Sequence, residues 1–177
     1  MIFSVHEHSA VSVRSFTVLL VLLAASSYLL SSCSTGSVTD QDVKAAFAAC
    51  TAGIQAAASG SSVTTYPVSG ETDVTQTSAD GKVVITTKDF PGSAQTYWSV
   101  TFSNSANSGY TISGTLSGSV SGYGTSSEVI SQAGTLSMRG GPVTSLAFST
   151  QSTGSSQGPF TFSGDVVANG TKTVVLP

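Results

Sequence analysis

Most of this chain alternates between apolar and polar residues with a period of two, from Val63 to near its end. In the clearest stretch, residues 110–120, the even-numbered positions include Tyr110, Ile112, Leu116 and Val120. The odd-numbered positions all hold serine or threonine. Successive side chains of a β-strand point to opposite faces. The alternation therefore predicts a mainly β domain whose strands have one face in a core and the other in water.

Turn residues interrupt this pattern at short intervals. Asp80-Gly81 and Asn169-Gly170 are two-residue hairpin signals. The connections are too short for parallel crossovers, so the sheet is expected to be antiparallel. About seven or eight strands are expected, drawn from the ranges 63–69, 72–78, 82–89, 95–104, 109–121, 128–139, 142–152, 159–168 and 171–176.

One helix is predicted ahead of the strands, from residue 40 to about residue 58. Thr39 can cap its first turn, and Gly60 is expected to end it in a left-handed conformation. Its apolar residues form one stripe: Val43, Phe47, Cys50 and Ile54. Cys50 lies on that stripe, so we expect a small buried core residue and not a reactive thiol.

The dimensions of these elements restrict the architecture. The helix would be about 28 Å long, close to the ~30 Å of a nine-residue strand, so it could lie along the sheet. A flat sheet of eight strands would be about 38 Å wide, and one helix about 10–12 Å across could not cover it. Glycines at positions 114, 118, 134 and 164 favour bends in the strands. We expect one N-terminal helix packed on the concave face of a strongly curved antiparallel sheet. A β-sandwich or closed barrel with an outlying helix is the alternative.

The N-terminal part of the chain has a different composition. An apolar run at residues 16–30 follows Arg14. Its length of about 15 residues is short of the ~20 that a membrane-spanning helix needs, and it suits the apolar region of a secretory signal peptide. An uncleaved membrane anchor is the alternative. Both histidines, His6 and His8, precede the run.

The end of this run, Leu30-Ser31-Ser32-Cys33, resembles the lipobox of bacterial lipoproteins, with Leu three residues before Cys and two small residues between them. The resemblance implies that a diacylglycerol is transferred to the Cys33 thiol and that the chain is cleaved after Ser32. In diderm bacteria an Asp after the Cys commonly retains a lipoprotein in the inner membrane, so Ser34 favours the outer membrane. An ordinary secretory signal with an incidental Cys is the alternative.

Cleavage at this point would divide the chain into three parts. They are a signal peptide at 1–32, the lipidated Cys33 with a polar tether at 33–38, and a single helix-plus-β domain at 39–177. The mature chain would contain no histidine, and Cys50 would be its one free thiol.

Few residues of this domain are suited to catalysis or metal binding. Without histidine or a cysteine pair, no metal or cofactor is expected, and Glu71 with Asp73 is interpreted as an exposed polar edge. Residues 154–158 match the G-x-S-x-G motif only formally, because that motif requires a His partner and a strand-to-helix turn. We therefore do not expect an enzyme. With six Lys and Arg in total, we expect no nucleic-acid partner.

The expected function is that of a lipid-anchored envelope lipoprotein, held to the membrane through Cys33 and acting as a non-enzymatic surface or periplasmic interaction module. The alternative is a carrier or chaperone that binds an apolar ligand, a lipid or acyl chain, in the concave face of the sheet. The candidate ligand-binding residues for this alternative are Trp98, Phe102, Ile112, Leu116 and Phe148. Tyr97 falls on the opposite face from Trp98 and is a candidate for exposed contacts.

Overall fold

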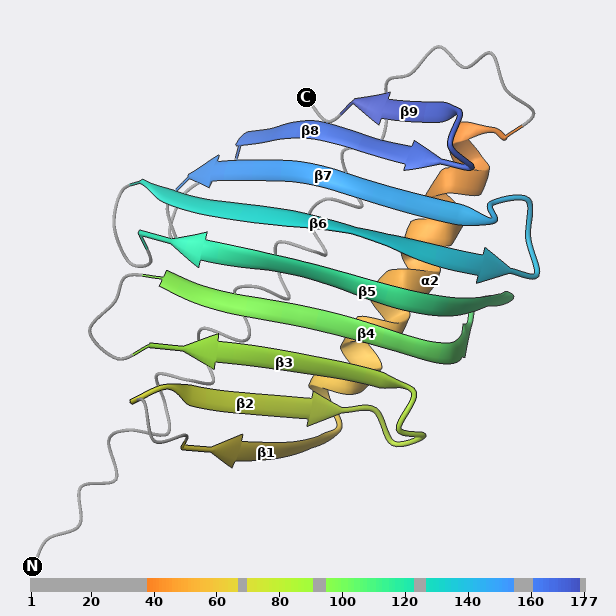
Figure 1. Ribbon diagram of the computed structural model, residues 1–177. Helices are drawn as coiled ribbons and strands as arrows, with labels where there is room; N and C mark the ends of the chain where they lie inside the picture. Colours follow the sequence, from red (N-terminus) through yellow and green to blue (C-terminus); the bar gives the residue numbers. More distant parts are fainter. Residues whose placement is uncertain (1–37, 67–69, 91–94, 123–126, 155–160, 176–177) are drawn as a thin grey trace, which may run out of the picture.

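The computed structural model describes residues 38–66, 70–90, 95–122, 127–154 and 161–175. These residues form one helix and one nine-stranded antiparallel sheet, whose strands lie side by side in chain order (Figure 1). The elements are α2 (Asp40–Ala58), β1 (Ser61–Thr65), β2 (Thr72–Thr77), β3 (Val83–Asp89), β4 (Gln95–Asn107), β5 (Tyr110–Ser121), β6 (Glu128–Arg139), β7 (Ser145–Gly154), β8 (Thr161–Ala168) and β9 (Lys172–Val175). The predicted helix on an antiparallel sheet is confirmed. Because β1 and β9 are the two edges of an open sheet, the closed-barrel and sandwich alternatives are wrong for this part of the chain.

The helix α2 has the predicted bounds because local hydrogen bonds fix its start. The Thr39 hydroxyl accepts a hydrogen bond from the Asp42 N–H (3.2 Å), and the Asp42 carboxylate accepts one from the Thr39 N–H (2.8 Å), which makes a capping box. The prediction of a left-handed Gly60 is wrong, because Ser59 caps the helix in the right-handed region. Gly60 instead allows its backbone to lie close to the end of β2, because a Cβ there would lie 1.8 Å from the Thr77 carbonyl oxygen.

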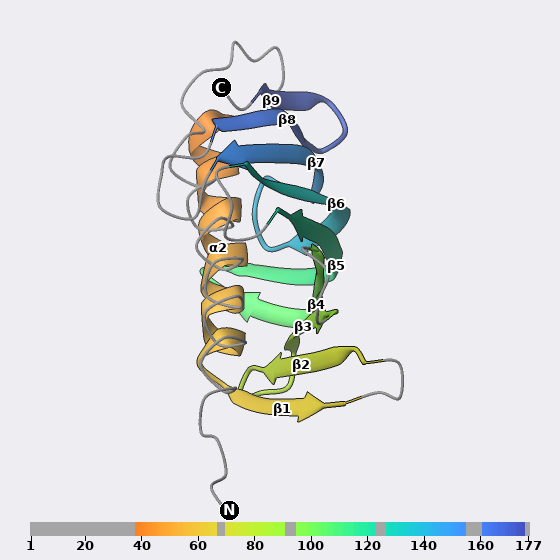
Figure 2. The same cartoon turned by 90° about the vertical axis from the view of Figure 1, so that its left-hand side faces the viewer.

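The direction of α2 differs from the one that its length suggested. It crosses the strands at a steep angle and does not run along them (Figures 1 and 2). In this direction a helix of about 28 Å packs on β2, β3, β4 and β5 and reaches Phe148 of β7 through Phe47. A helix parallel to the strands would cover the width of two or three of them at most. Because it crosses the strands, one helix can contact strands from β2 to β7.

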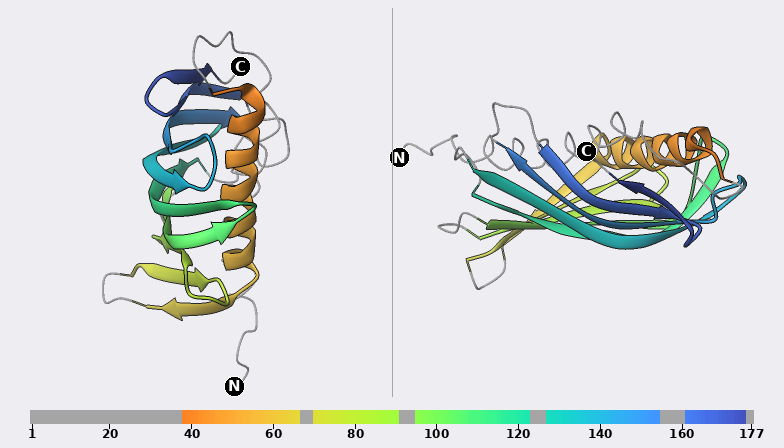
Figure 3. Two further views of the ribbon diagram at one scale, coloured as in Figure 1. Left: turned by 90° about the vertical axis from the view of Figure 1, so that its right-hand side faces the viewer. Right: turned by 90° about the horizontal axis from the view of Figure 1, so that it is seen from above.

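The sheet curves toward α2, which lies on its concave side (Figure 3). We call the face that carries α2 the inner face and the opposite one the outer face. Two glycines of the inner face stand between large side chains of neighbouring strands: Gly114 pairs with Phe102 and Leu136, and Gly134 pairs with Leu116 and Phe148. Their φ angles are 127° and 145°, and an added Cβ would lie 2.6 Å from the Thr135 carbonyl oxygen and 2.4 Å from the Thr115 carbonyl oxygen, respectively. The bend therefore requires glycine at both positions.

The helix lies close to the sheet because small residues form much of its packed side. Ala46, Ala49 and Ala57 have no exposed surface, and a Cβ on Gly53 would lie 2.8 Å from the Phe102 ring. The sequence pattern identified the larger apolar stripe of α2, whose members are all buried. The alanines are a contact surface in addition to being helix formers.

The hairpin turns explain where the strand ends differ from expectation. Asn169-Gly170 forms the predicted turn, with φ angles of 54° and 68°, and it makes β9 a full member of the sheet. A second turn of the same kind, at Ser108-Gly109 with φ angles of 46° and 83°, was not predicted. It lets β4 continue past an irregularity after Phe102 as far as Asn107.

Replacing Gly118 by Ala should lower the free energy of unfolding by about 2–3 kcal/mol, the upper part of the range for overpacking. The added Cβ would lie 2.0 Å from the Ser131 carbonyl oxygen and 2.6 Å from the Trp98 ring. Urea unfolding followed by Trp98 fluorescence measures the change. Ser117→Ala, at the exposed neighbouring position, is the control and should change stability by less than about 0.5 kcal/mol. Equal stability of the two variants would contradict the close approach.

Candidate functional site

The five residues predicted to line an apolar binding site all lie in the hydrophobic core. Their exposed fractions are 3% for Trp98, 2% for Phe102, 0% for Ile112, 2% for Leu116 and 6% for Phe148. Phe148 meets the Phe47 ring of α2 edge to face, with centroids 5.3 Å apart. Side chains of the helix therefore fill the inner face directly beneath α2.

The residues of the lipobox resemblance, Leu30, Ser31, Ser32 and Cys33, lie outside the described residues, as do most of residues 154–158. The described part of the chain starts at Val38, which is buried in the core, and Thr39, which caps α2. No helix of this part is long and apolar enough to cross a membrane.

Cys50 and Lys88 are candidate reactive groups, and the first is buried while the second is engaged in ion pairs. Burial raises the pKa of the Cys50 thiol to about 12, so it stays protonated at neutral pH and is a poor nucleophile. The Lys88 ammonium lies 2.7 Å from Glu71 and 3.4 Å from Asp73, and its hydrogen bond to Glu71 lowers the pKa of that carboxyl group. No group of metal-ligating side chains is present among the described residues.

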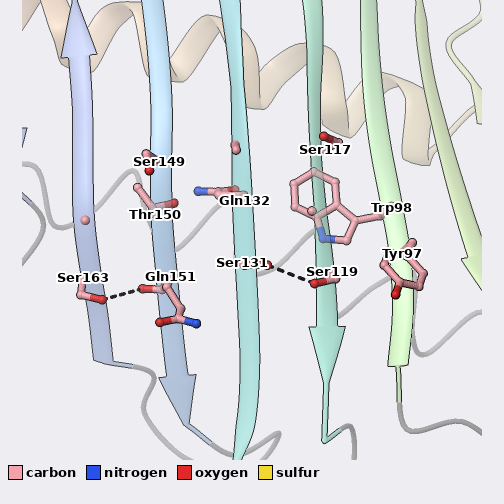
Figure 4. Close-up of a pocket in the computed structure, with 13 residues that line it drawn as sticks. Tyr97, Trp98, Ser117, Ser119, Ser131, Gln132, Ser149, Thr150, Gln151 and Ser163 are labelled. Atoms are coloured by element: carbon pink, nitrogen blue, oxygen red, sulfur yellow. Dashed lines mark hydrogen bonds between the residues drawn. The ribbon is translucent and has the colours of Figure 1, made fainter.

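A shallow trough crosses five strands on the outer face, in the half of the sheet that α2 does not cross (Figures 1 and 4). Its volume is about 600 Å³, within the ordinary range for small-molecule sites. One row of cross-strand neighbours forms its floor: Tyr97, Ser119, Ser131, Gln151 and Ser163 of β4 to β8. A second row beside it contributes Ser117, Ala133 and Ser149. Small side chains on the four adjacent strands β5 to β8 thus produce the hollow, and Tyr97 of β4 closes one end of it.

The trough is polar but uncharged, since none of the described residues that line it is ionisable except the Tyr97 phenol. The Ser119 and Ser131 hydroxyls lie 3.0 Å apart in a hydrogen bond, and the Ser163 hydroxyl donates to the Gln151 carbonyl (3.4 Å; Figure 4). Tyr97 is 43% exposed and is steadied by an edge-to-face contact with Phe90. This arrangement offers hydroxyl and amide hydrogen bonds and one aromatic side chain.

The inner face has a second region of interest, at strand positions that alternate with those of the trough. Trp98 and Ser152 are 3% and 2% exposed, yet the indole N–H and the hydroxyl have no hydrogen-bond partner among the described residues. Thr150 and Gln132 are buried beside them in the same inward rows. Buried polar atoms without a partner are costly, so an acceptor that reached these two donors would be favoured.

Sequence reasoning found the exposed Tyr97 but not the trough around it. The alternation predicted that the serines face solvent, and serine is a small residue. Their alignment into one trough, however, depends on the register of four strand pairs. The sequence carries no local signal for this alignment, because the residues that meet in the trough belong to five different strands.

Comparisons with known proteins found no relative of this chain. No family model matches the chain, and neither a curated protein nor a solved structure is significantly similar to it.

Proposed function

We propose that this chain is a lipid-anchored lipoprotein of the bacterial envelope, more specifically of the outer membrane. Its β domain acts as a non-enzymatic interaction module that binds a neutral, polar partner on the outer face. The observation that carries the binding role is the uncharged trough between Tyr97 and Ser163. The lipobox resemblance of Leu30 to Cys33 supports the anchor, and Ser34 supports the outer membrane.

The position of the folded domain supports close attachment to the membrane. Because Val38 is in the core and Thr39 caps α2, the tether between Cys33 and the fold is only four residues long, at 34–37. A flexible chain of this length reaches about 11 Å, so the first turn of α2 would lie near the lipid headgroups. Two or three acyl chains on Cys33 suffice for stable anchoring, at about 0.8 kcal/mol per buried CH₂.

The chemistry of the trough defines the class of partner. Hydroxyls both donate and accept hydrogen bonds, so the trough can match alcohols, amides and ethers. An anionic ligand would find no cation among the described lining residues, and Lys88, which lies opposite Tyr97 on β3, is held by Glu71 and Asp73. Selectivity against anions follows from the missing compensation.

The anchor is tested by mass spectrometry of the N-terminal peptide from the purified membrane fraction. The expected product begins at Cys33 and carries a diacylglycerol on the thiol. Cys33→Ser should abolish lipid attachment and remove the protein from the lipid-modified fraction, whereas Cys50→Ala should leave attachment unchanged because Cys50 is buried in the fold. An unmodified Cys33, or an intact segment 1–32, would contradict the anchor.

The binding face is tested by placing a photo-reactive benzophenone side chain at Ser131, inside the trough, in cells with an intact envelope. A discrete cross-linked product is expected at this position. Thr135 is the matched control, since it is exposed on the same strand and lies about 13 Å further along it. Equal cross-linking at both positions, or none at Ser131, would argue against a partner in the trough.

The second candidate function, a carrier for a lipid or acyl chain, is favoured by one observation. The Trp98 N–H and the Ser152 hydroxyl are buried without a partner on the inner face, near the apolar side chains of Val120 and Ile130. An amphiphile with an oxygen acceptor would satisfy the two donors and pack its apolar part against these side chains. Of the five apolar candidates, Trp98 would then contact the ligand, while Phe102, Ile112, Leu116 and Phe148 would support the fold.

Native mass spectrometry of residues 34–177 separates the two candidates. A copurifying lipid is the result expected of a carrier. Ser152→Ala should then reduce the lipid-bound fraction while raising the stability of the empty domain by about 1 kcal/mol, because a buried hydroxyl without a partner is removed. Thr135→Ala, on the outer face, should change neither property. A clean mass without ligand would exclude the carrier and leave the interaction module.

A further inference from the structure

The first strand of the sheet has one edge to which no described strand is paired. β1 is hydrogen-bonded to β2 on one side only, and all five of its residues, Ser61–Thr65, are exposed. Three large apolar or aromatic side chains of the described residues are exposed, and two of them belong to this edge: Val63 at 59% and Tyr66 at 72%. An exposed strand with exposed apolar side chains is a ready template for another strand.

The usual features that protect an edge strand are missing from β1. Natural proteins place charges, proline or bulges on such edges, but Ser61–Thr65 contains none of the charged residues and no proline, and its register with β2 is regular. The nearest carboxylate, Asp73 opposite Thr65, is an ion partner of Lys88. No net charge on the edge therefore opposes the approach of a second strand.

The sequence of β1 is complementary to itself in the antiparallel direction. If a second copy is placed with a two-fold axis at Val63, then Ser61 lies opposite Thr65, Ser62 lies opposite Thr64, and the two Val63 side chains meet. Ser and Thr make favourable cross-strand pairs, and like charges directly opposite are unfavourable. A residue on a two-fold axis always faces its own copy, so an apolar β-branched residue is well suited to this position.

We propose that β1 is a homodimerisation edge, at which two copies of this chain join by antiparallel β1–β1 pairing centred on Val63. The two nine-stranded sheets become one continuous sheet. Pairing of Ser61–Thr65 leaves both outer-face troughs free, since the troughs lie on β4 to β8. The dimer does not depend on the proposed function of the trough. A shared membrane anchor would add to it by holding copies at high local concentration.

Disulfide trapping in the full-length chain tests the pairing. The variant Val63→Cys, oxidised in the native membrane, should form a disulfide-linked dimer, because paired Cα atoms in antiparallel strands are about 4.5–5.5 Å apart and a disulfide spans that distance. Thr65→Cys is the matched control on the same edge and face. In the proposed register its two copies are about 14 Å apart, beyond the reach of a disulfide. Val63→Cys should therefore give at least about tenfold more dimer.

A second pair of variants tests the register independently. Ser62→Cys and Thr64→Cys should form a mixed disulfide when they are expressed together, and much less dimer when each is expressed alone. Native Cys50 does not interfere, because it is buried, and any disulfide through Cys33 would be equal in all variants. Absence of dimer in Val63→Cys, or equal amounts in Val63→Cys and Thr65→Cys, would overturn the proposal.

Discussion

The fold depends on the close approach of one helix to a sheet that bends around it. Inward-facing glycines make this possible, because Gly114 and Gly134 leave space between the large side chains of their neighbours and adopt φ angles that other residues rarely adopt. On the helix side, Ala49 and Gly53 let the α2 backbone come near the sheet. Large side chains on one partner thus meet small ones on the other, which is how interiors reach their high packing density.

The outer face of the sheet is polar and hollowed because its side chains are mostly small. Where the inner positions hold large apolar side chains, the outer positions are mostly serine, threonine and alanine, so the outer surface is polar, low in charge and hollowed between Tyr97 and Ser163. Hydroxyls allow this face to be wet without the Lys and Glu that usually solubilise a protein. The result is a surface that offers uncharged hydrogen-bonding groups and an edge strand, β1, that carries no charged residue.

Much of the fold could be predicted because the relevant signals are local. Thr39 and Asp42 fix the start of α2 through contacts three residues apart, and the turn at Asn169-Gly170 is set by its own backbone. The crossing direction of α2 could not be predicted, since it results from contacts between Phe47 and a strand about a hundred residues later. The role of Gly60 was missed for the same reason, because its constraint is the carbonyl group of Thr77 on another strand.

The sequence by itself determined the class of the domain, one capped helix followed by antiparallel strands, because hydrophobic period and turn chemistry are properties of short segments. It also determined the absence of histidine after residue 8 and the low charge of every face. Only the tertiary structure decided which residues became a site. Trp98 and Phe102 both point inward from β4, yet Phe102 lies against Gly53 of α2, while Trp98 lies at the part of the strand that carries the trough. Alignment of Tyr97 with serines from four further strands into one trough is likewise a consequence of strand register, which arises only when the whole sheet has formed.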